Sequence, residues 1–152
     1  MLHFAYGSNM DRGLMQRRCA NAVAIGPARL DKWRFIVTRD GYASVVPDAS
    51  AVVHGVLWRL SPRDLAAVNA YESLDSGLYR RRMLPVRCGR CVTALVYVAR
   101  QRSAGRAKPG YQELVVEAAR GWRLPADYIE ELVGWVPGGR STMRAIELGE
   151  IA

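Results

Sequence analysis

Residues 1–10 read MLHFAYGSNM, an apolar run that leads straight into Tyr6-Gly7-Ser8-Asn9-Met10. Glycine tolerates backbone conformations that other residues avoid, and serine and asparagine can hydrogen-bond to their own backbone, so this stretch favours a turn. One interpretation is a simple hairpin turn, and the other is a loop that holds a small charged molecule. Residues 1–10 alone do not distinguish the hairpin turn from the ligand-binding loop.

Length and composition indicate one domain that spans residues 1–152. A chain of this length can bury a sizeable core without metals or disulfides. Half of the residues are apolar, but no uninterrupted apolar stretch approaches the ~20 residues that a membrane helix needs. The first residues lack the basic segment, the long apolar segment and the small-residue cleavage site of a signal peptide. We therefore expect a cytoplasmic protein that has no membrane partner.

The formal net charge is +8, and 20 of the 22 basic residues are arginine, the exceptions being Lys32 and Lys108. A basic surface can attract nucleic acid or anionic substrates. Apart from the run Arg80-Arg81-Arg82, however, the arginines are scattered along the chain and are not interleaved with aromatic residues, as an RNA-binding surface would require. A nucleic-acid partner is therefore not expected.

The hydrophobic pattern alternates between the strand period of two and the helix period of 3.6. This predicts a mixed α+β fold, with a strongly curved sheet or small barrel of about six strands flanked by helices. The predicted strands are 2–6, 28–38, 42–48, 51–60, 78–88 and 91–100, with 47–50 joining the third to the fourth. The predicted helices are 11–20, 61–73, 111–122 and 125–135, and residues 101–110 form a polar loop. Ser61 is expected to cap the second helix, with Pro62 in its first turn.

Cys88 and Cys91 form a C-x-x-C motif, which raises the possibilities of a zinc site and a redox site. Zinc needs about four ligands, and the other candidates by residue type, Cys19, His3 and His54, stand at no recognisable spacing. A thioredoxin-like motif should open a helix, whereas this one flanks a predicted two-residue hairpin loop at residues 89–90. We expect reduced, structural cysteines and no metal.

Other familiar catalytic patterns are weak. Ser8 stands in G-S-N rather than in G-x-S-x-G, and neither His3 nor His54 has an obvious partner, so both histidines are expected in the core or on the surface. No glycine-rich nucleotide-binding pattern is present.

Glu72 is a more specific candidate. It follows Leu65 by seven residues, so on a helix it falls only about 20° from the apolar line of Leu65 and Val68. A carboxylate that points toward the core has a raised pKa, which suits a general acid and base near neutral pH. The alternatives are that Glu72 ends the helix in solvent or pairs with a residue of the run 80–82.

Three stretches, in order, resemble the γ-glutamylcyclotransferase family, also called AIG2-like. The first is Tyr6–Met10, which matches the Y-G-S-N-[LM] signature. The second, LAAVNAYESLDSGLYRRR at 65–82, resembles a helix that ends in the catalytic glutamate, with a tyrosine seven residues later. The third, KPGYQELVVEAARGWRLPADYIEEL at 108–132, is similar to a helix opened by a tyrosine and followed by Leu-Pro-x-x-Tyr.

The resemblance implies a barrel of five to six strands flanked by helices. It also implies a transferase or lyase that needs no cofactor and converts a small γ-glutamyl amide into 5-oxoproline and a free amine or amino acid. The substrate's own α-amine attacks the γ-carbonyl, and Glu72 acts as general acid and base. Gly7 is expected to adopt a positive φ and to let the backbone approach the ligand. The implied substrate-binding residues are Tyr6, Gly7, Ser8, Asn9 and Met10, whose N–H groups from Gly7 onward form an anion nest, together with Tyr79 and Tyr111.

Two departures keep an alternative open. The chain is more basic than expected for an enzyme of free peptides, and the residues around Glu72 do not copy the family pattern letter for letter. The alternative is a non-catalytic binding module on the same fold, possibly for an anionic partner.

Overall fold

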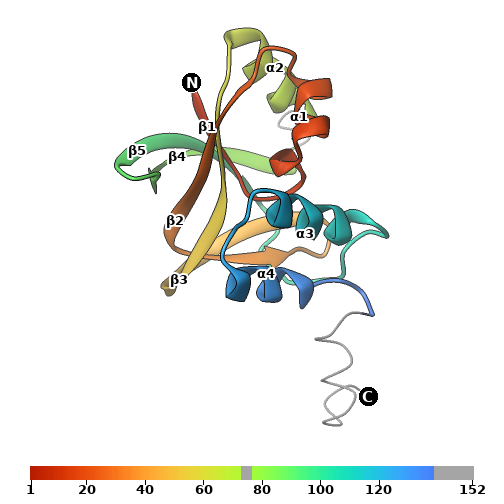
Figure 1. The fold of residues 1–152 in the computed structure, drawn as a ribbon. Helices are drawn as coiled ribbons and strands as arrows, with labels where there is room; N and C mark the ends of the chain where they lie inside the picture. Colours follow the sequence, from red (N-terminus) through yellow and green to blue (C-terminus); the bar gives the residue numbers. More distant parts are fainter. Residues whose placement is uncertain (73–76, 139–152) are drawn as a thin grey trace.

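The computed structural model describes residues 1–72 and 77–138, and Ser73, the last residue of the second predicted helix, lies outside them. The helices and strands follow one another along the chain as shown in Figure 1. They are β1 (Leu2–Ala5), the short 3-10 helix η1 (Ser8–Met10), α1 (Arg12–Arg18), β2 (Val23–Val37), β3 (Ala43–Arg59), α2 (Pro62–Tyr71), β4 (Tyr79–Arg87), β5 (Cys91–Ala99), α3 (Tyr111–Gly121) and α4 (Ala126–Val133).

The strands of the described residues form a closed barrel in the order β1-β3-β2-β4-β5. The neighbouring strands pair antiparallel except at the closure, where β1 runs parallel to β5 through the pair His3 and Leu95. The α+β fold class predicted from the sequence is confirmed, with five strands in place of about six. Closing the sheet removes its free edges and leaves the strand ends to form a mouth.

The missing strand is explained by β3, which continues through the predicted connection at residues 47–50 as one strand. Pro47 has no N–H for the ladder and would normally break it. Here it pairs with Trp33 next to a register shift: Asp31 pairs with Val52, so that residues 48–51 of β3 bulge opposite Lys32 of β2, which adopts a φ of 70°. Such a bulge interrupts the hydrogen-bond ladder next to Pro47, so the missing N–H of the proline is tolerated there.

The helices begin and end where local chemistry favours them. Asp11 caps α1 by accepting a hydrogen bond from the Leu14 N–H at 2.8 Å. Ser61 and Asp64 form a reciprocal capping box at the start of α2, which confirms the predicted cap and its proline in the first turn. Figure 1 shows α1 and α2 together at one end of the barrel and α3 and α4 side by side at the other.

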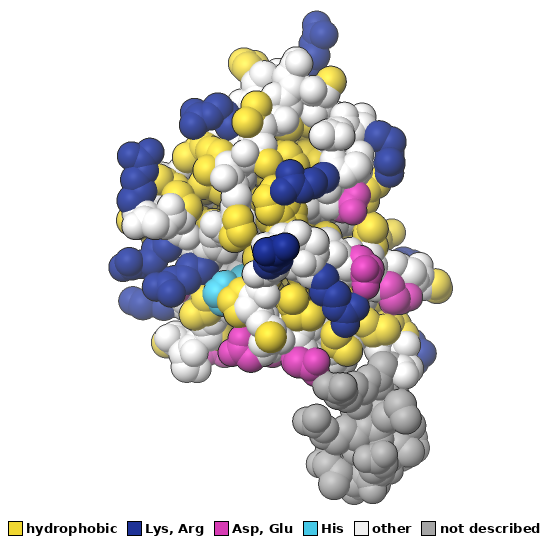
Figure 2. Space-filling model, in the orientation of Figure 1, with side chains coloured by type: hydrophobic (Ala, Val, Ile, Leu, Met, Phe, Trp, Pro, Cys, Tyr) yellow, Lys and Arg dark blue, Asp and Glu magenta, His cyan; other side chains and the backbone are white. Residues whose placement is uncertain are grey.

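The core fills the barrel and the space beneath the helices. Fully buried side chains come from every layer, among them Phe4 of β1, Val53 of β3, Val96 of β5 and Leu132 of α4. The basic side chains are spread over the face seen in Figure 2, with their densest group at one edge. None of the helices in the described ranges has the length and apolar character to span a membrane.

Candidate active site

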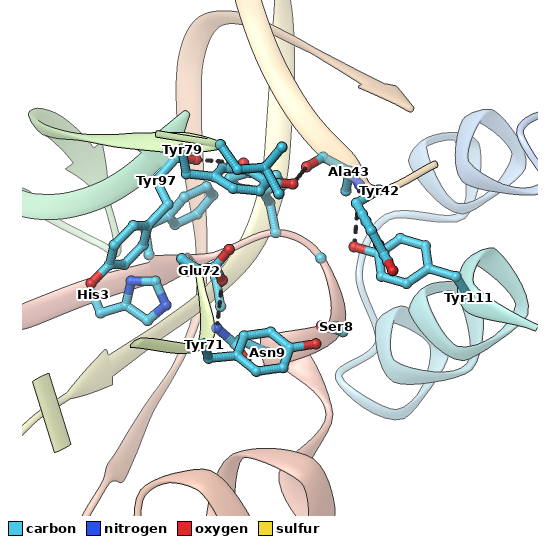
Figure 3. Close-up of a pocket in the computed structure, with 15 residues that line it drawn as sticks. His3, Ser8, Asn9, Tyr42, Ala43, Tyr71, Glu72, Tyr79, Tyr97 and Tyr111 are labelled. Atoms are coloured by element: carbon cyan, nitrogen blue, oxygen red, sulfur yellow. Dashed lines mark hydrogen bonds between the residues drawn. The ribbon is translucent and has the colours of Figure 1, made fainter. Parts of the chain in front are cut away.

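A pocket of about 210 Å³ opens at the mouth of the barrel, where the end of β1 passes into η1. Figure 3 shows its lining, which is contributed by β1, η1, the start of β3, the end of α2, β4, β5 and the start of α3. Seven of the eight residues that the sequence indicated line it: Tyr6, Gly7, Ser8, Asn9, Glu72, Tyr79 and Tyr111. The pocket therefore brings together all three stretches that carried the resemblance.

Met10 is the exception and does not line the pocket. Its side chain is fully buried, its N–H donates to the Gly7 carbonyl at 3.1 Å, and its carbonyl accepts a hydrogen bond from the Trp122 indole at 2.7 Å. Because the Met10 N–H is used to close the 3-10 turn, it does not belong to an anion nest. Its role is to anchor η1 to the end of α3.

Gly7 provides the space for a close approach between the loop and its neighbours. Its φ is −115°, so the expectation of a positive φ is wrong. A Cβ added here would stand 2.9 Å from the Tyr111 hydroxyl oxygen and 3.3 Å from the Cβ of Ala43. Since real Cβ atoms essentially never approach another heavy atom to 2.9 Å, only glycine lets the loop lie this close to Tyr111.

Glu72 sits at the point where α2 ends, and its N–H still donates to the Val68 carbonyl at 2.9 Å. Its carboxylate enters the pocket and accepts a hydrogen bond from Asn9 Nδ2 at 3.2 Å. Val68 is fully buried and Leu65 partly buried, so Glu72 does continue the inward-facing side of the helix.

The electrostatic surroundings of Glu72 favour the protonated form. Burial raises its pKa from 4.5 to about 7, against the opposing effects of the Arg18 charge and the Asn9 hydrogen bond. None of the ion pairs found among the described residues joins Glu72 to the arginine run 80–82. A carboxyl group of this kind can both accept and return a proton near neutral pH.

Two tyrosine hydroxyls hold the same backbone unit, that of Ala43 at the start of β3. Tyr79 donates to the Ala43 carbonyl at 2.8 Å, whereas Tyr111 accepts from the Ala43 N–H at 3.2 Å. Burial raises the pKa of both phenols, so both stay protonated at physiological pH. The Tyr79 proton is therefore already used, while Tyr111 keeps a proton that it can donate into the pocket.

Tyr6 lies deeper than the other loop residues. Its side chain is 6% exposed and its hydroxyl donates to the Tyr97 carbonyl on β5. It therefore contributes to the wall of the pocket and ties the end of β1 to β5.

His3 also lines the pocket, although sequence reasoning assigned it to the core or the surface. Nδ1 lies 3.2 Å from the Leu95 carbonyl, which only accepts, so Nδ1 carries the proton and Nε2 offers a lone pair. Nε2 is buried with no partner among the described residues, and burial lowers the pKa of the imidazole to about 4. No feature of the sequence distinguishes this histidine from an ordinary buried one.

Arg18 is a second residue that sequence reasoning did not include in the site. It is the last residue of α1, and its Nη1 donates to Ser8 Oγ at 3.3 Å and to Asn9 Oδ1. One signal could have found it. Its helical spacing from Leu14 and from the buried Met15 turns it toward the interior, where an arginine needs polar partners.

The three cysteines do not line this pocket and are free thiols. Cys91 opens β5, and Cys88 falls within the turn, because Arg87 pairs directly with Cys91. The loop thus has three residues rather than the predicted two. No group of three or more potential metal-binding side chains occurs in the described ranges.

The fold and the pocket together place this chain among small α+β barrel proteins with a buried carboxyl group at the barrel mouth. The chain belongs to the family described as gamma-glutamyl cyclotransferase, AIG2-like, whose model matches residues 3–123. The family resemblance seen in the sequence is confirmed.

Curated relatives and solved structures agree with this membership. Gamma-glutamylcyclotransferase of Mus musculus is 26% identical over 143 residues, which cover 86% of this chain and 76% of the relative. The Homo sapiens protein of the same name is 24% identical over 162 residues, covering 99% and 86%. A solved structure named gamma-glutamyl cyclotransferase shares the fold with a TM-score of 0.81 at 23% identity, covering 87% of this chain and 85% of the other. The general function that these names support is gamma-glutamyl cyclotransfer.

Proposed function

We propose that this protein is an enzyme that releases 5-oxoproline from a γ-glutamyl amide, with Glu72 as general acid and base. The observation that carries the proposal is the Glu72 carboxyl group, whose pKa of about 7 and place in the pocket beside the Tyr6–Asn9 loop suit proton transfer at neutral pH. The names of the family and of the curated relatives support the same reaction class.

The chain's own groups can bind the glutamyl part of the substrate. The first N–H groups of a helical turn have no partner within the turn, and in η1 these are the N–H groups of Ser8 and Asn9 at the pocket, that of Ser8 also contacting the Tyr111 hydroxyl. Such a group of N–H donors suits the α-carboxylate of the substrate. A pocket of about 210 Å³ is small for a ligand site, which matches a moiety the size of one amino acid.

The reaction needs few catalytic groups because nucleophile and electrophile belong to one molecule. The neutral α-amine attacks the γ-carbonyl carbon, a C–N bond forms and the amine proton passes to the Glu72 carboxylate. Tyr111 donates a hydrogen bond to the oxyanion, using the proton that its contact with Ala43 leaves free. The bond to the leaving nitrogen then breaks as Glu72 returns the proton. The products are 5-oxoproline and a free amine, and no water is consumed.

The test is a panel of γ-glutamyl amino acids, γ-glutamyl amines and glutathione, with 5-oxoproline measured by mass spectrometry. We expect release from at least one member at a rate that scales with enzyme concentration. The matched control for a Glu72→Gln variant is Glu117→Gln. It removes an exposed carboxylate of α3 whose contact is the surface pair with Arg120. Tight binding of a panel member without turnover at any pH would instead support the binding-module alternative.

A further inference from the structure

Arg18 connects three residues of the pocket wall that come from two elements, η1 and α2. Its Nη1 bonds Ser8 and Asn9 of η1, and its guanidinium carbon lies 3.3 Å from the centre of the Tyr71 ring at the end of α2. A planar guanidinium stacked on an aromatic ring is held in both position and tilt. Arg18 is therefore fixed from two sides rather than free on the surface.

This arrangement determines which way the Asn9 amide faces. An arginine can only donate, so the Asn9 oxygen must face Arg18. The Asn9 Nδ2 consequently faces Glu72 and donates to its carboxylate at 3.2 Å. Without Arg18, the amide could turn over and present its oxygen to Glu72, a contact that only the protonated carboxyl group can satisfy.

We propose that Arg18 is a positioning residue of the site, which locks the Asn9 amide as a donor toward Glu72 and holds Ser8 at the pocket. Arg18 acts through these residues and not on the substrate. Only the kinetic test of this inference rests on the proposed function. The contacts of Arg18 exist in the protein without substrate.

Arg18 also supplies the positive charge that opposes the effect of burial on Glu72. The other titratable groups that face the carboxyl group are neutral near pH 7. The phenols keep their protons because burial raises their pKa, and the pKa of the imidazole, about 4, keeps it uncharged. They are His3 of β1, Tyr6 directly after that strand, Tyr79 of β4, Tyr97 of β5 and Tyr111 of α3. Removing the arginine thus removes both the charge and the lock on Asn9.

The experiment replaces Arg18 by methionine, which keeps an unbranched apolar stem and removes the charge. Arg17→Met is the matched control, because Arg17 is the exposed neighbour in the same helical turn. The first readout needs no substrate: the side-chain carboxyl carbon of Glu72 is titrated by NMR in ¹³C-glutamate-labelled protein and assigned with Glu72→Gln. We expect a midpoint near pH 7 in the wild type and in Arg17→Met, and a rise of about one pH unit or more in Arg18→Met.

The second readout is the pH dependence of kcat/KM for 5-oxoproline release. In Arg18→Met the rise of kcat/KM with pH should shift to higher pH by about one unit, as the Glu72 midpoint does. Activity then falls about fivefold at pH 7 and recovers near pH 9. Damage to the fold would lower the rate at every pH instead. Arg18→Lys, which keeps the charge but cannot stack or bond in the same way, should show a smaller move.

A double-mutant cycle separates the lock on Asn9 from the charge itself. In an Asn9→Ala background, Arg18→Met should raise the Glu72 midpoint by less than it does in the wild type, because part of its effect passes through Asn9. An equal rise in both backgrounds would overturn the lock. An unchanged midpoint in Arg18→Met, with the protein folded, would overturn the whole inference. Absence of 5-oxoproline release by the wild type would count against the proposed function and leave the NMR test intact.

Discussion

Glu72→Gln is the substitution that tests the site most directly. Glutamine keeps the volume of glutamate and one carbonyl-type oxygen, but it can neither take the proton of the attacking amine nor return it to the leaving nitrogen. General acid–base assistance is worth about 10²–10⁴-fold, so kcat should fall by at least that order. The wild-type rate should rise through about pH 7, because attack needs the deprotonated carboxylate.

The same substitution should stabilise the protein in a manner that depends on pH. The folded state raises the pKa of Glu72 from 4.5 to about 7, so between these values the folded protein holds a proton that the unfolded chain releases. The stability of the wild type therefore falls as the pH rises through this window. The gap between the two pKa values corresponds to about 3 kcal/mol, reached in full only above the folded value.

Glutamine does not ionise and avoids this cost. The free energy of unfolding of Glu72→Gln should exceed that of the wild type by about 1 kcal/mol at pH 5 and by about 3 kcal/mol at pH 8, as an upper estimate for a group with some access to water. Urea denaturation at the two pH values measures the difference, and mass spectrometry of 5-oxoproline measures kcat. If the variant kept more than about a tenth of the wild-type kcat, Glu72 would not be the acid–base group. A stability difference that does not change with pH would refute the raised pKa.

Three further variants test two other residues of the site and the role of the C-x-x-C cysteines. Gly7→Ala should raise KM for the γ-glutamyl substrate while the protein stays folded, because its Cβ would stand 2.9 Å from the Tyr111 hydroxyl; an unchanged KM would remove the loop from the site. Tyr111→Phe should lower kcat by about 10²-fold if it supplies an oxyanion donor, and a loss below threefold would assign the hydroxyl to the Ala43 contact alone. Replacing Cys88 and Cys91 together by serine should leave activity unchanged, a result that stoichiometric zinc lost with activity in the variant would contradict.

Much of the fold could be predicted because its signals are local. The cap at Ser61 and the change of period after it located α2, and the two runs of strand-forming residues on either side of Gly89-Arg90 located the hairpin of β4 and β5. The continuity of β3 could not be predicted in this way. It depends on pairing with β2, where the partner shifts from Val52 for Asp31 to Pro47 for Trp33, so that residues 48–51 bulge out without ending the strand. A sequence window around Pro47 contains nothing about its partner.

The site shows the same division. Glu72 was found because helical spacing relates it to Leu65 and Val68 within one element. Arg18 and His3 were not included in the site because their significance arises from partners on other elements: Asn9 for the arginine, and for His3 the Leu95 carbonyl on the strand that closes the barrel. A resemblance based on short motifs identifies residues within those motifs. It does not identify side chains elsewhere in the chain that position the motif residues.

The backbone of Ala43 has a consequence for how this pocket should be dissected. Tyr79 and Tyr111 arrive from β4 and α3, and both address the peptide groups of one residue rather than its side chain. Side-chain replacement at position 43 leaves both hydrogen bonds available. The residue is already alanine, so an alanine scan would not detect its contribution to the site. A chemical change of the main chain, such as replacing the Ala43 amide by an ester, would withdraw the donor that orients Tyr111. Two hydrogen bonds at this pocket thus depend on main-chain groups, which a change of the amino acid at position 43 leaves in place.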